Sequence, residues 1–339
     1  MNEIKKHLPQ KNAEDLFRFI DSNTISSEKI VAPRYSYWKS VFRVFFRKKT
    51  NIFLIAALLM ILLVSFIMPS FWSYDPQENV TNAATFNLKP AAAMRFFSSP
   101  EGKAYLAASK TASDGPLKWI LGTGAMGNSI FYGIIASART SLLLAIICAA
   151  INMTIGIIIG AVWGYSKRLD AILLVIYNII ANVPDILLLS VLVYVIGSGF
   201  WSFIFALTVT GWLGIAFFFR TQVMVIRDRE YSLASRCLGT PVHRVISKNI
   251  LPFLTSVIVT LLATNLPSYI SSEVFLSYIG IGLSASVPSL GRMIQQGQTA
   301  FMTFPHAFWP PVAVAASITI ILYLLGQNLA DASDPRTHM

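Results

Sequence analysis

The sequence predicts an all-α membrane protein with six transmembrane helices. Hydrophobic residues make up 55% of its 339 residues and charged residues only 13%, which is about half the charged share of an average soluble domain. The mean hydropathy is +0.60. Six apolar stretches follow one another along the chain, each long enough to cross the ~30 Å hydrocarbon core of a bilayer. These observations exclude an ordinary soluble domain and make the lipid bilayer a partner.

The distribution of positive charge predicts how the chain is oriented. The net charge is +11, and 20 of the 27 Lys and Arg residues fall before residue 51, within residues 166–170 and 220–252, or after residue 329. Segments rich in Lys and Arg stay on the cytoplasmic side of a membrane. We therefore expect a multi-pass protein of a bacterial cell (plasma) membrane with both termini in the cytoplasm, and no nucleic-acid partner.

The N-terminal part of the chain contains one apolar span between two polar segments. Residues 1–50 are expected to form a cytoplasmic tail and an interfacial helix, because residues 38–49 mix aromatic and basic side chains. Residues 51–72 are expected to form the first transmembrane helix. Residues 73–127 are polar and too long for a mere connection, so we expect an extracellular loop or small subdomain.

The remaining residues, 128–329, are expected to form a five-helix core, followed by a cytoplasmic C-terminal tail at residues 330–339. Pro267 is expected to bend the fifth span. Between the last two spans, residues 271–305 are expected to form an external re-entrant or surface segment. The second to sixth spans are expected at residues 141–164, 171–197, 200–219, 253–270 or beyond, and 308–329.

Residues 220–252 contain a basic helical hairpin between two apolar spans. Asp228 is the candidate N-cap of a first short helix, and the ten residues after it contain neither Gly nor Pro. Gly239 ends that helix, Thr240 can cap a second one, and Pro241 occupies its first position. The second helix has a largely apolar face at helical spacing, formed by Val242, Val245, Ile246, Asn249 and Ile250. This shape suits docking to another protein.

Two other interpretations of the hairpin were weighed. A basic loop beside membrane spans is also explained by the positive-inside rule alone, without any partner. A helix-turn-helix that reads DNA is excluded by geometry, because apolar spans flank the hairpin directly and leave no tether long enough to reach a duplex.

The hairpin resembles a known motif. The run EYSLASRCLG at residues 230–239, followed by Ile250-Leu251-Pro252, resembles the EAA loop of ABC-importer permeases. Leu233 stands where that family usually has an acid, Ser235 where the second Ala falls, and Asn249 near the usual His or Ile. In the family this loop is a coupling helix that sits in a groove of the ATPase subunit. The resemblance implies ATPase-coupling roles for Glu230, Tyr231, Ala234, Ser235, Gly239, Thr240, Pro241, Leu251 and Pro252.

Other segments carry the same resemblance. They are WILGT at residues 119–123, ARTSL at 138–142, EVFLSYIGIG at 273–282, PSLG at 288–291 and DASDPR at 331–336, which resemble parts of dipeptide and oligopeptide permeases. The resemblance implies a type I ABC importer permease fold with a cytoplasmic coupling helix. It also implies a homologous permease as heterodimer partner, two ATP-binding subunits and an extracellular peptide-binding protein. The chain has no P-loop motif, so it is not expected to be an enzyme, and ATP and Mg are expected on the partner subunits.

The cargo and the transport class have alternatives. Within the same family, nickel, heme or an antimicrobial peptide can replace oligopeptides as cargo. A secondary transporter is the main rival class, but it usually places its helix breaks and ionisable residues in two repeated halves, and the sequence shows no such repeat. A membrane-anchored sensor or scaffold would leave the hairpin without an energetic role.

Five polar residues at or near membrane depth are candidates for a translocation path: Asn178, Asn182, Asp185, Asn265 and Glu273. Such residues face protein or water, so they either line the path or form interhelical hydrogen bonds. The four histidines are scattered, and no Ser/His/Asp arrangement is indicated by spacing, so no catalytic or metal site is predicted. The two cysteines, Cys148 and Cys237, are not expected to form a disulfide.

Overall fold

The computed structural model describes residues 37–71, 74, 85–108 and 116–333. Expectations for residues 1–36, for most of residues 72–84 and for residues 334–339 lie outside the described part. By contacts within the chain, residues 1–40 and 41–339 form two separate units. The described part of the first unit consists of the start of one helix, where the rings of Tyr37 and Trp38 meet edge to face at 5.4 Å.

The first two helices form an amphipathic segment followed by an apolar span. In α1 (Tyr37–Arg47), the residues from Val41 onward belong to the second unit, and Val41 and Phe45 are buried there. Asn51 donates from Nδ2 to the carbonyl of Phe45 at 2.8 Å, which fixes the bend into α2 (Lys49–Phe71). A short amphipathic helix thus precedes an apolar one.

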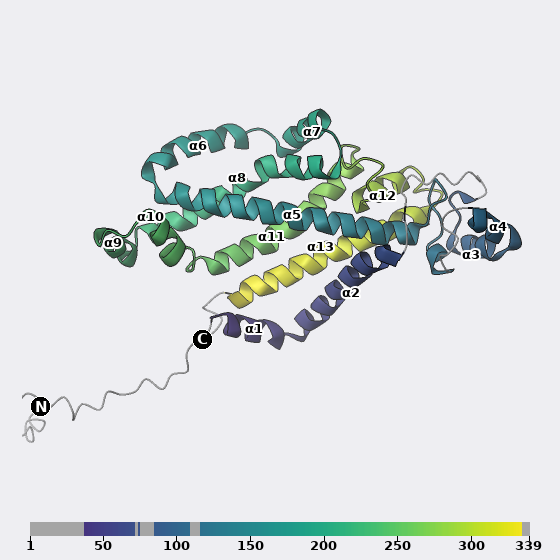
Figure 1. Cartoon of the computed structure of the whole chain (residues 1–339), viewed down its shortest axis with the longest axis horizontal. Coiled ribbons are helices and arrows are strands. Elements are labelled where there is room, and N and C mark those ends of the chain that lie inside the picture. The colour runs from purple at the N-terminus through teal and green to yellow at the C-terminus, as the bar shows by residue number, and fades with distance from the viewer. Residues whose placement is uncertain (1–36, 72–73, 75–84, 109–115, 334–339) are drawn as a thin grey trace, which may run out of the picture. The chain divides into compact units, whose positions relative to one another are not determined.

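Four single helices of the second unit have the length and hydropathy of membrane spans. They are α2, α5 (Ile130–Tyr165), α8 (Phe200–Arg227) and α13 (Pro305–Ser333). Two bent helix pairs qualify as well if each is counted as one span, so the described residues contain four to six candidate spans. In Figure 1, α5, α8, α11 (Thr255–Tyr278) and α13 run side by side. The all-α membrane fold agrees with the prediction.

The ends of several spans differ from the prediction. α5 has 36 residues and begins at Ile130, because Ser129 caps it by accepting a hydrogen bond from the Tyr132 N–H at 3.2 Å. At 1.5 Å per residue it is about 54 Å long, so it extends beyond a ~30 Å hydrocarbon core. α8 runs to Arg227, eight residues into the segment expected as a loop, and α13 continues through Ser333 into the expected tail.

The third span, expected at residues 171–197, is not one continuous helix. The chain forms α6 (Lys167–Ala181) and α7 (Asp185–Ile196), which are bent by 80° at a short break. Pro184 lies in the break, and proline both lacks an N–H and disfavours helical backbone in the residue before it. Asn182 adds a competing bond, since its Nδ2 donates to the carbonyl of Asn178 at 2.5 Å.

The fifth span begins with a second sharp bend. The short helix α10 (Val242–Arg244) and the π-helical turn η4 (Val245–Ile250) are bent by 78° relative to α11. α11 then runs without a break through Pro267 to Tyr278. Residues 271–278 are therefore helical, and only the later part of the expected external segment is irregular, up to α12 (Leu290–Gln298).

Figure 1 places α3 (Pro90–Ser98), α4 (Pro100–Ala108) and α12 at the end of the second unit that is opposite α9 (Glu230–Cys237) and α10. The segment expected as a polar loop therefore contains two short helices. Phe97 of α3 stacks on Trp119 with ring centroids 3.7 Å apart. This contact gives the segment a small aromatic core of its own.

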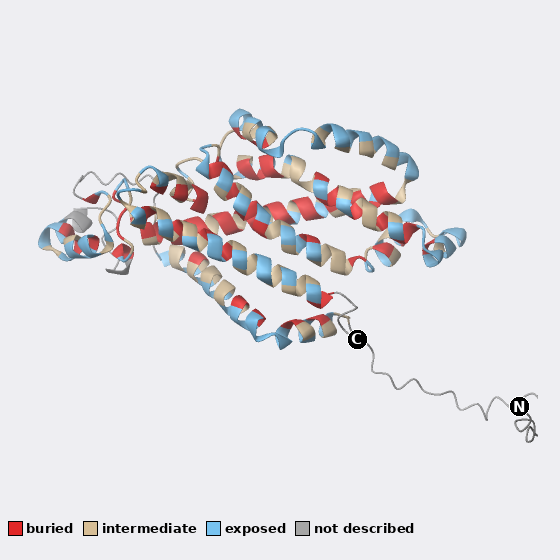
Figure 2. Ribbon diagram, turned by 180° about the vertical axis from the view of Figure 1, so that it is seen from behind, coloured by how far each residue is buried: buried red, intermediate tan, exposed pale blue. Residues whose placement is uncertain are grey.

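The core lies where α5 packs on α8. Figure 2 shows buried residues concentrated on these helices, whereas α6 is mostly exposed. Three glycines at every fourth position of α5 allow the close approach: a Cβ on Gly156 would lie 2.7 Å from a methyl carbon of Ile215, and one on Gly164 would lie 2.9 Å from Val223 Cβ. Gly160 stands between them. Small residues at this spacing are typical of close helix contacts in membranes.

Candidate functional site

The hairpin leaves α8 at Arg227, whose side chain ties it to the core. Arg227 is 5% exposed and donates from Nη1 to the carbonyl of Gly164 on α5 at 2.9 Å. Its Nε and Nη2 donate to the carboxylate of Asp228 at 3.0 and 3.1 Å, and these bonds hold the pKa of that carboxyl below its usual range. Asp228 is thus the C-cap of α8. The expectation that it caps α9 is wrong, because Arg229 occupies that position.

The turn between the two short helices is built on Gly239. Its φ of +76° is left-handed backbone that residues with a Cβ rarely adopt. The N–H of Thr240 bonds back to the Ser235 carbonyl at 3.1 Å, as expected at a glycine helix terminus. Pro241 has extended backbone, and α10 begins only at Val242. Pro241 therefore precedes the second helix, and the expectation that Thr240 caps it is wrong.

Buried aliphatic residues hold the hairpin against the long helices. Val245 and Ile250 are completely buried and Leu254 is 3% exposed. They belong to a cluster that also contains Ile215 and Phe219 of α8. The expected inward apolar face is confirmed at Val245 and Ile250, whereas Val242 at the same spacing is 52% exposed. The hairpin is therefore packed against α8 through buried side chains.

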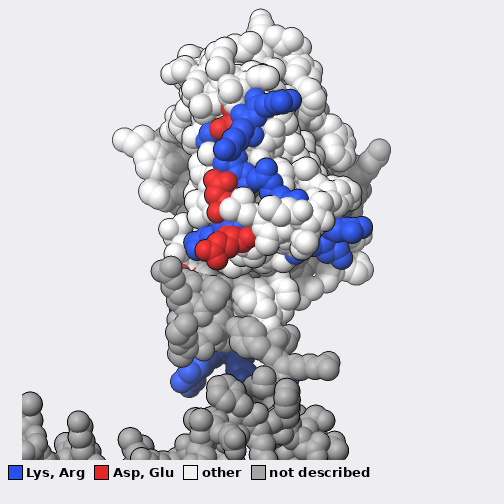
Figure 3. Space-filling model, turned by 90° about the vertical axis from the view of Figure 1, so that its left-hand side faces the viewer, with Lys and Arg blue, Asp and Glu red and all other residues white. Residues whose placement is uncertain are grey.

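The outer surface of the hairpin combines exposed apolar residues with basic ones. Leu238 is 85% exposed, and Tyr231 and Leu233 are 44% and 43% exposed. Figure 3 views this end, where Lys and Arg surfaces gather around a few acidic ones. The exposed basic residues of the hairpin are Arg229, Arg236, Arg244 and Lys248. An apolar centre with a polar rim is the usual composition of a protein interface.

All nine residues expected to couple to an ATPase are accessible. Six are exposed: Glu230, Tyr231, Ala234, Gly239, Pro241 and Pro252. The other three, Ser235, Thr240 and Leu251, are half-buried. Asn249 donates from Nδ2 to Ser235 Oγ at 3.0 Å and so links η4 to α9. The set is therefore brought together on one hairpin with a fixed angle between its two arms.

A cavity of about 750 Å³ lies along the break between α6 and α7, lined also by α8 and α11. Of the five residues expected on a translocation path, the structure brings only Asp185 to this cavity, where it is the one charged side chain. The rest of its polar lining consists mainly of hydroxyl groups, from Thr210, Ser268, Tyr269, Ser271 and Ser272. Such a lining can hydrogen-bond a polar solute and attract a cationic group.

The other expected path residues lie elsewhere. Asn178 and Asn182 are exposed and bonded to each other along α6. Asn265 donates to the Leu261 carbonyl of its own helix at 2.7 Å. None of the three lines the 750 Å³ cavity.

Glu273 is fully buried at a junction of three helices. Its carboxylate accepts from the hydroxyls of Ser141 on α5 and Ser277 on α11, both at 2.9 Å. The backbone N–H of Leu290, at the start of α12, donates to the same Ser141 hydroxyl at 3.2 Å. These contacts correspond to interhelical hydrogen bonding, the alternative that the sequence left open, and they fix α12 to the bundle.

The sequence interpretation missed one cluster that positions α6. Arg220 of α8 forms an ion pair with Asp170 of α6 through Nε, and its Nη2 donates to Oδ2 at 2.9 Å. Trp163 Nε1 donates to Asp170 at 2.8 Å, and Tyr177 stacks on Phe217 at 4.3 Å. α6 has no buried residue of its own, so these contacts are a main attachment of α6 to the bundle. The only sequence signal of this cluster was a lone acid beside Lys167 and Arg168.

Comparison with known proteins assigns most of the chain to families. Residues 152–339 match the model of the binding-protein-dependent transport system inner membrane component. Residues 36–90 match the N-terminal transmembrane domain of oligopeptide transport permease C. The first match alone covers more than half of the chain, and it includes the hairpin and the 750 Å³ cavity.

Curated relatives agree with these matches. The chain is 42% identical over 327 residues to the oligopeptide transport system permease protein AmiD of Streptococcus pneumoniae, covering 96% of this chain and 98% of the relative. It is 28% identical over 329 residues to OppC of Bacillus subtilis, with 96% and 99% covered. It is 35% identical over 219 residues to the dipeptide permease DppC of that species, with 63% and 68% covered. The chain therefore belongs to the ABC-transporter inner-membrane permeases of the dipeptide and oligopeptide importer family.

Proposed function

We propose that this chain is one of two membrane subunits of an ATP-driven importer and forms half of the translocation pathway for oligopeptides. The observation that carries the proposal is the hairpin, an exposed apolar and basic surface held to α5 and α8 by buried residues. The cargo is inferred from relatives that are named as oligopeptide and dipeptide permeases. The chain supplies no ATP site in this proposal, and ATP and Mg bind two partner ATPase subunits.

The hairpin is the coupling element in this mechanism. Leu238 and Tyr231 contact a groove of an ATPase subunit, and the basic rim sets the orientation. When the ATPase moves, the force reaches α8 through Val245 and Ile250, which are completely buried. Arg227 passes it on to α5 through the Gly164 carbonyl. Such a contiguous packed network is what a transmitted rigid-body motion requires.

The bent pair α6 and α7 borders the proposed path. Its cavity places Asp185 among hydroxyl groups, which suits the ammonium end and the backbone of a peptide. A homologous permease subunit supplies the other wall. Asn178 and Asn182, exposed on α6, are then available to that partner or to the path.

The orientation follows from the basic residues. The hairpin and both termini face the cytoplasm of a bacterium, and α3, α4 and α12 face outward, because Figure 1 shows them at the opposite end of the second unit. Residues 73–127 then form an external subdomain, on the side where an extracellular peptide-binding protein delivers its cargo. The Phe97–Trp119 stack gives that subdomain a rigid base.

Co-expression and reconstitution test the proposal. The tagged chain should co-purify with a homologous permease and an ATPase, and the complex in liposomes should hydrolyse ATP faster when a peptide-loaded binding protein is added. Uptake of labelled peptides, nickel and heme should be compared in the same vesicles. Uptake without any ATPase would indicate a secondary transporter. Uptake of nickel or heme but not of peptide would show that the cargo is not a peptide.

A further inference from the structure

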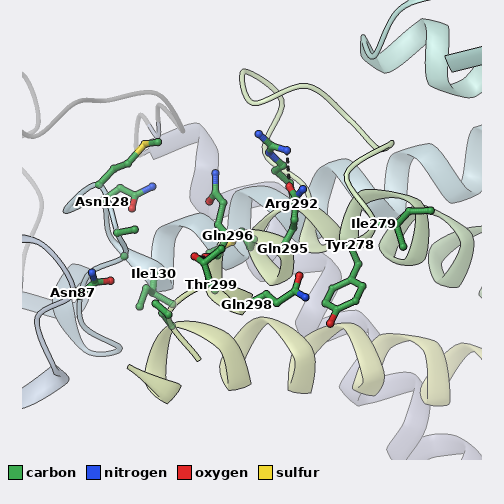
Figure 4. Close-up of a pocket in the computed structure, with 17 residues that line it drawn as sticks. Asn87, Asn128, Ile130, Tyr278, Ile279, Arg292, Gln295, Gln296, Gln298 and Thr299 are labelled. Carbon is green, nitrogen blue, oxygen red and sulfur yellow. Dashed lines mark hydrogen bonds between the residues drawn. The ribbon is translucent and has the colours of Figure 1, made fainter. Parts of the chain in front are cut away.

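A second cavity, of about 440 Å³, lies at the end of the molecule opposite the hairpin. Figure 4 shows its walls: Asn87 and Asn128 come from loops near the start of α5, Arg292 and three glutamines come from α12, and Thr299 follows α12. Its volume falls in the range of small-ligand sites, about 300–1,000 Å³. None of the motifs discussed above assigns it a role.

Two buried polar atoms in this lining have no hydrogen-bond partner within the described part of the chain. They are Nε of Arg292, a donor, and Oδ1 of Asn87, an acceptor. A buried polar group without a partner costs free energy, so such atoms are rare in folded proteins. Arg292 is also the one charged residue of the lining, and its Nη1 donates only to the neutral Gln295 at 2.5 Å. An acceptor oxygen complements the Arg292 guanidinium, and an N–H donor complements the Asn87 amide oxygen.

The position of Asn87 is held by the backbone. Its φ is +52°, the one positive value at a non-glycine residue in the described structure. Its N–H donates to the Gly124 carbonyl at 2.9 Å. This is left-handed backbone, which asparagine adopts more readily than most other residues with a Cβ. The turn therefore places the buried Oδ1 at the wall of the cavity.

The remaining polar lining is rich in amides. Asn128, Gln295, Gln296 and Gln298 each carry both a donor and an acceptor. Such groups match peptide bonds, which also carry one donor and one acceptor, without selecting any particular side chain. Met126, Met293 and Ile279 provide apolar surface between them, and methionine adapts to side chains of varied shape.

We propose that this cavity binds the C-terminal part of a free oligopeptide, with the peptide carboxylate on Arg292 and a main-chain N–H on Asn87. The proposal rests on the proposed function, because it takes its ligand class from there. A guanidinium and a carboxylate form strong paired hydrogen bonds, and the amide groups hold the last peptide bonds. On the outer side of the membrane, the cavity is a first contact for peptide released from the binding protein.

A binding experiment with the full transporter in nanodiscs, without the binding protein, tests this assignment. The probes are fluorinated trialanine with a free carboxylate and the same peptide as its C-terminal amide, measured by ¹⁹F NMR. Free trialanine should bind at least tenfold more tightly than the amide. Arg292→Gln should abolish that difference, and Arg95→Gln, which removes the same charge from an exposed site on α3, should leave it intact.

Asn87→Gly separates ligand binding from a structural role. Glycine accepts the positive φ without strain, so the fold is kept while the buried Oδ1 is removed. We expect unchanged thermal stability and at least threefold weaker binding of the free peptide. If both probes bind equally to the wild type, or if Arg292→Gln leaves the difference in place, the assignment is overturned.

The outcome is independent of the proposed function. The complete system could still take up peptide while the nanodisc experiment shows no preference for the free carboxylate. That result would refute the peptide site in this cavity but not the proposed importer function. Loss of binding-protein association in Arg292→Gln, with free-peptide binding unchanged, would also overturn the proposal, because the cavity would then receive a segment of that protein.

Discussion

Asn249 and Ser235, two positions at which the sequence departs from the usual EAA loop pattern, are hydrogen-bonded to each other. Asn249 Nδ2 donates to Ser235 Oγ at 3.0 Å, and Ser235 in turn donates to the Tyr231 carbonyl at 2.9 Å. The bond joins η4 to α9 across the Gly239 turn. The bond therefore ties the two arms of the hairpin to each other.

Asn249→Ala should loosen the hairpin without unfolding the protein. One hydrogen bond of this kind contributes about 1 kcal/mol, which is small for a bundle but large for one hinge. We expect normal expression and a clear loss of peptide-stimulated ATP hydrolysis in reconstituted complex. Ser247→Ala, at an exposed site on the same turn, is the control. In a double-mutant cycle, Ser235→Ala should add little to Asn249→Ala; full additivity would show that the bond has no role.

Gly239→Val should uncouple transport from hydrolysis. No atom lies within 4 Å of a Cβ at this position, so the penalty is backbone strain of about 1–2 kcal/mol and not a clash. The relief of that strain changes the path of the turn and the direction in which Leu238 points. Uptake and stimulated hydrolysis should fall together while membrane insertion stays normal. Gly239→Asn is the matched control, because asparagine tolerates left-handed backbone; equal activity of both variants would make the hairpin a topological loop only.

The native cysteines report the topology. Cys237 is exposed in the hairpin and Cys148 is buried in α5, so the hairpin carries the one accessible thiol of the protein. A membrane-impermeant maleimide should leave intact cells unlabelled and should label Cys237 after permeabilisation. Glu101→Cys in a Cys237→Ala background should react from outside, since α4 lies at the opposite end. Labelling of Cys237 in intact cells would show that the hairpin faces outward, which contradicts the proposed orientation.

Asp170→Asn should release α6 from the bundle. The change leaves Arg220, 11% exposed, without its carboxylate partner, at a cost of about 1–3 kcal/mol. We expect a lower melting temperature of the purified complex and easier access of reagents to the cavity beside α6. Glu101→Gln serves as a control for the loss of an exposed acid. Adding Arg220→Gln should recover part of the stability, because no unpaired charge then remains. A further loss of stability in the double variant would show that the unpaired Arg220 charge does not cause the destabilisation by Asp170→Asn.

The sequence by itself determined the membrane class, the order of the spans and the position of the hairpin. Apolar runs of sufficient length must cross a bilayer as helices, because unpaired backbone groups are costly in hydrocarbon. The Gly239 turn followed equally from local chemistry, since glycine ends helices with positive φ. Motif similarity added the family. Each matching run consists of residues that are neighbours in the chain, so it can be recognised without knowledge of the tertiary structure.

Tertiary structure alone decided which distant polar groups are paired. Asp228 looked like a cap for the helix after it but bonds to Arg227, because that side chain is already fixed by the Gly164 carbonyl. Glu273 looked like a path residue but bonds to the hydroxyls of Ser141, on another helix, and of Ser277, on its own helix. Asp170 and Arg220 are 50 residues apart and meet only after α6 folds back. Interactions between distant residues depend on packing that no local pattern records, whereas helix formation depends mainly on neighbouring residues.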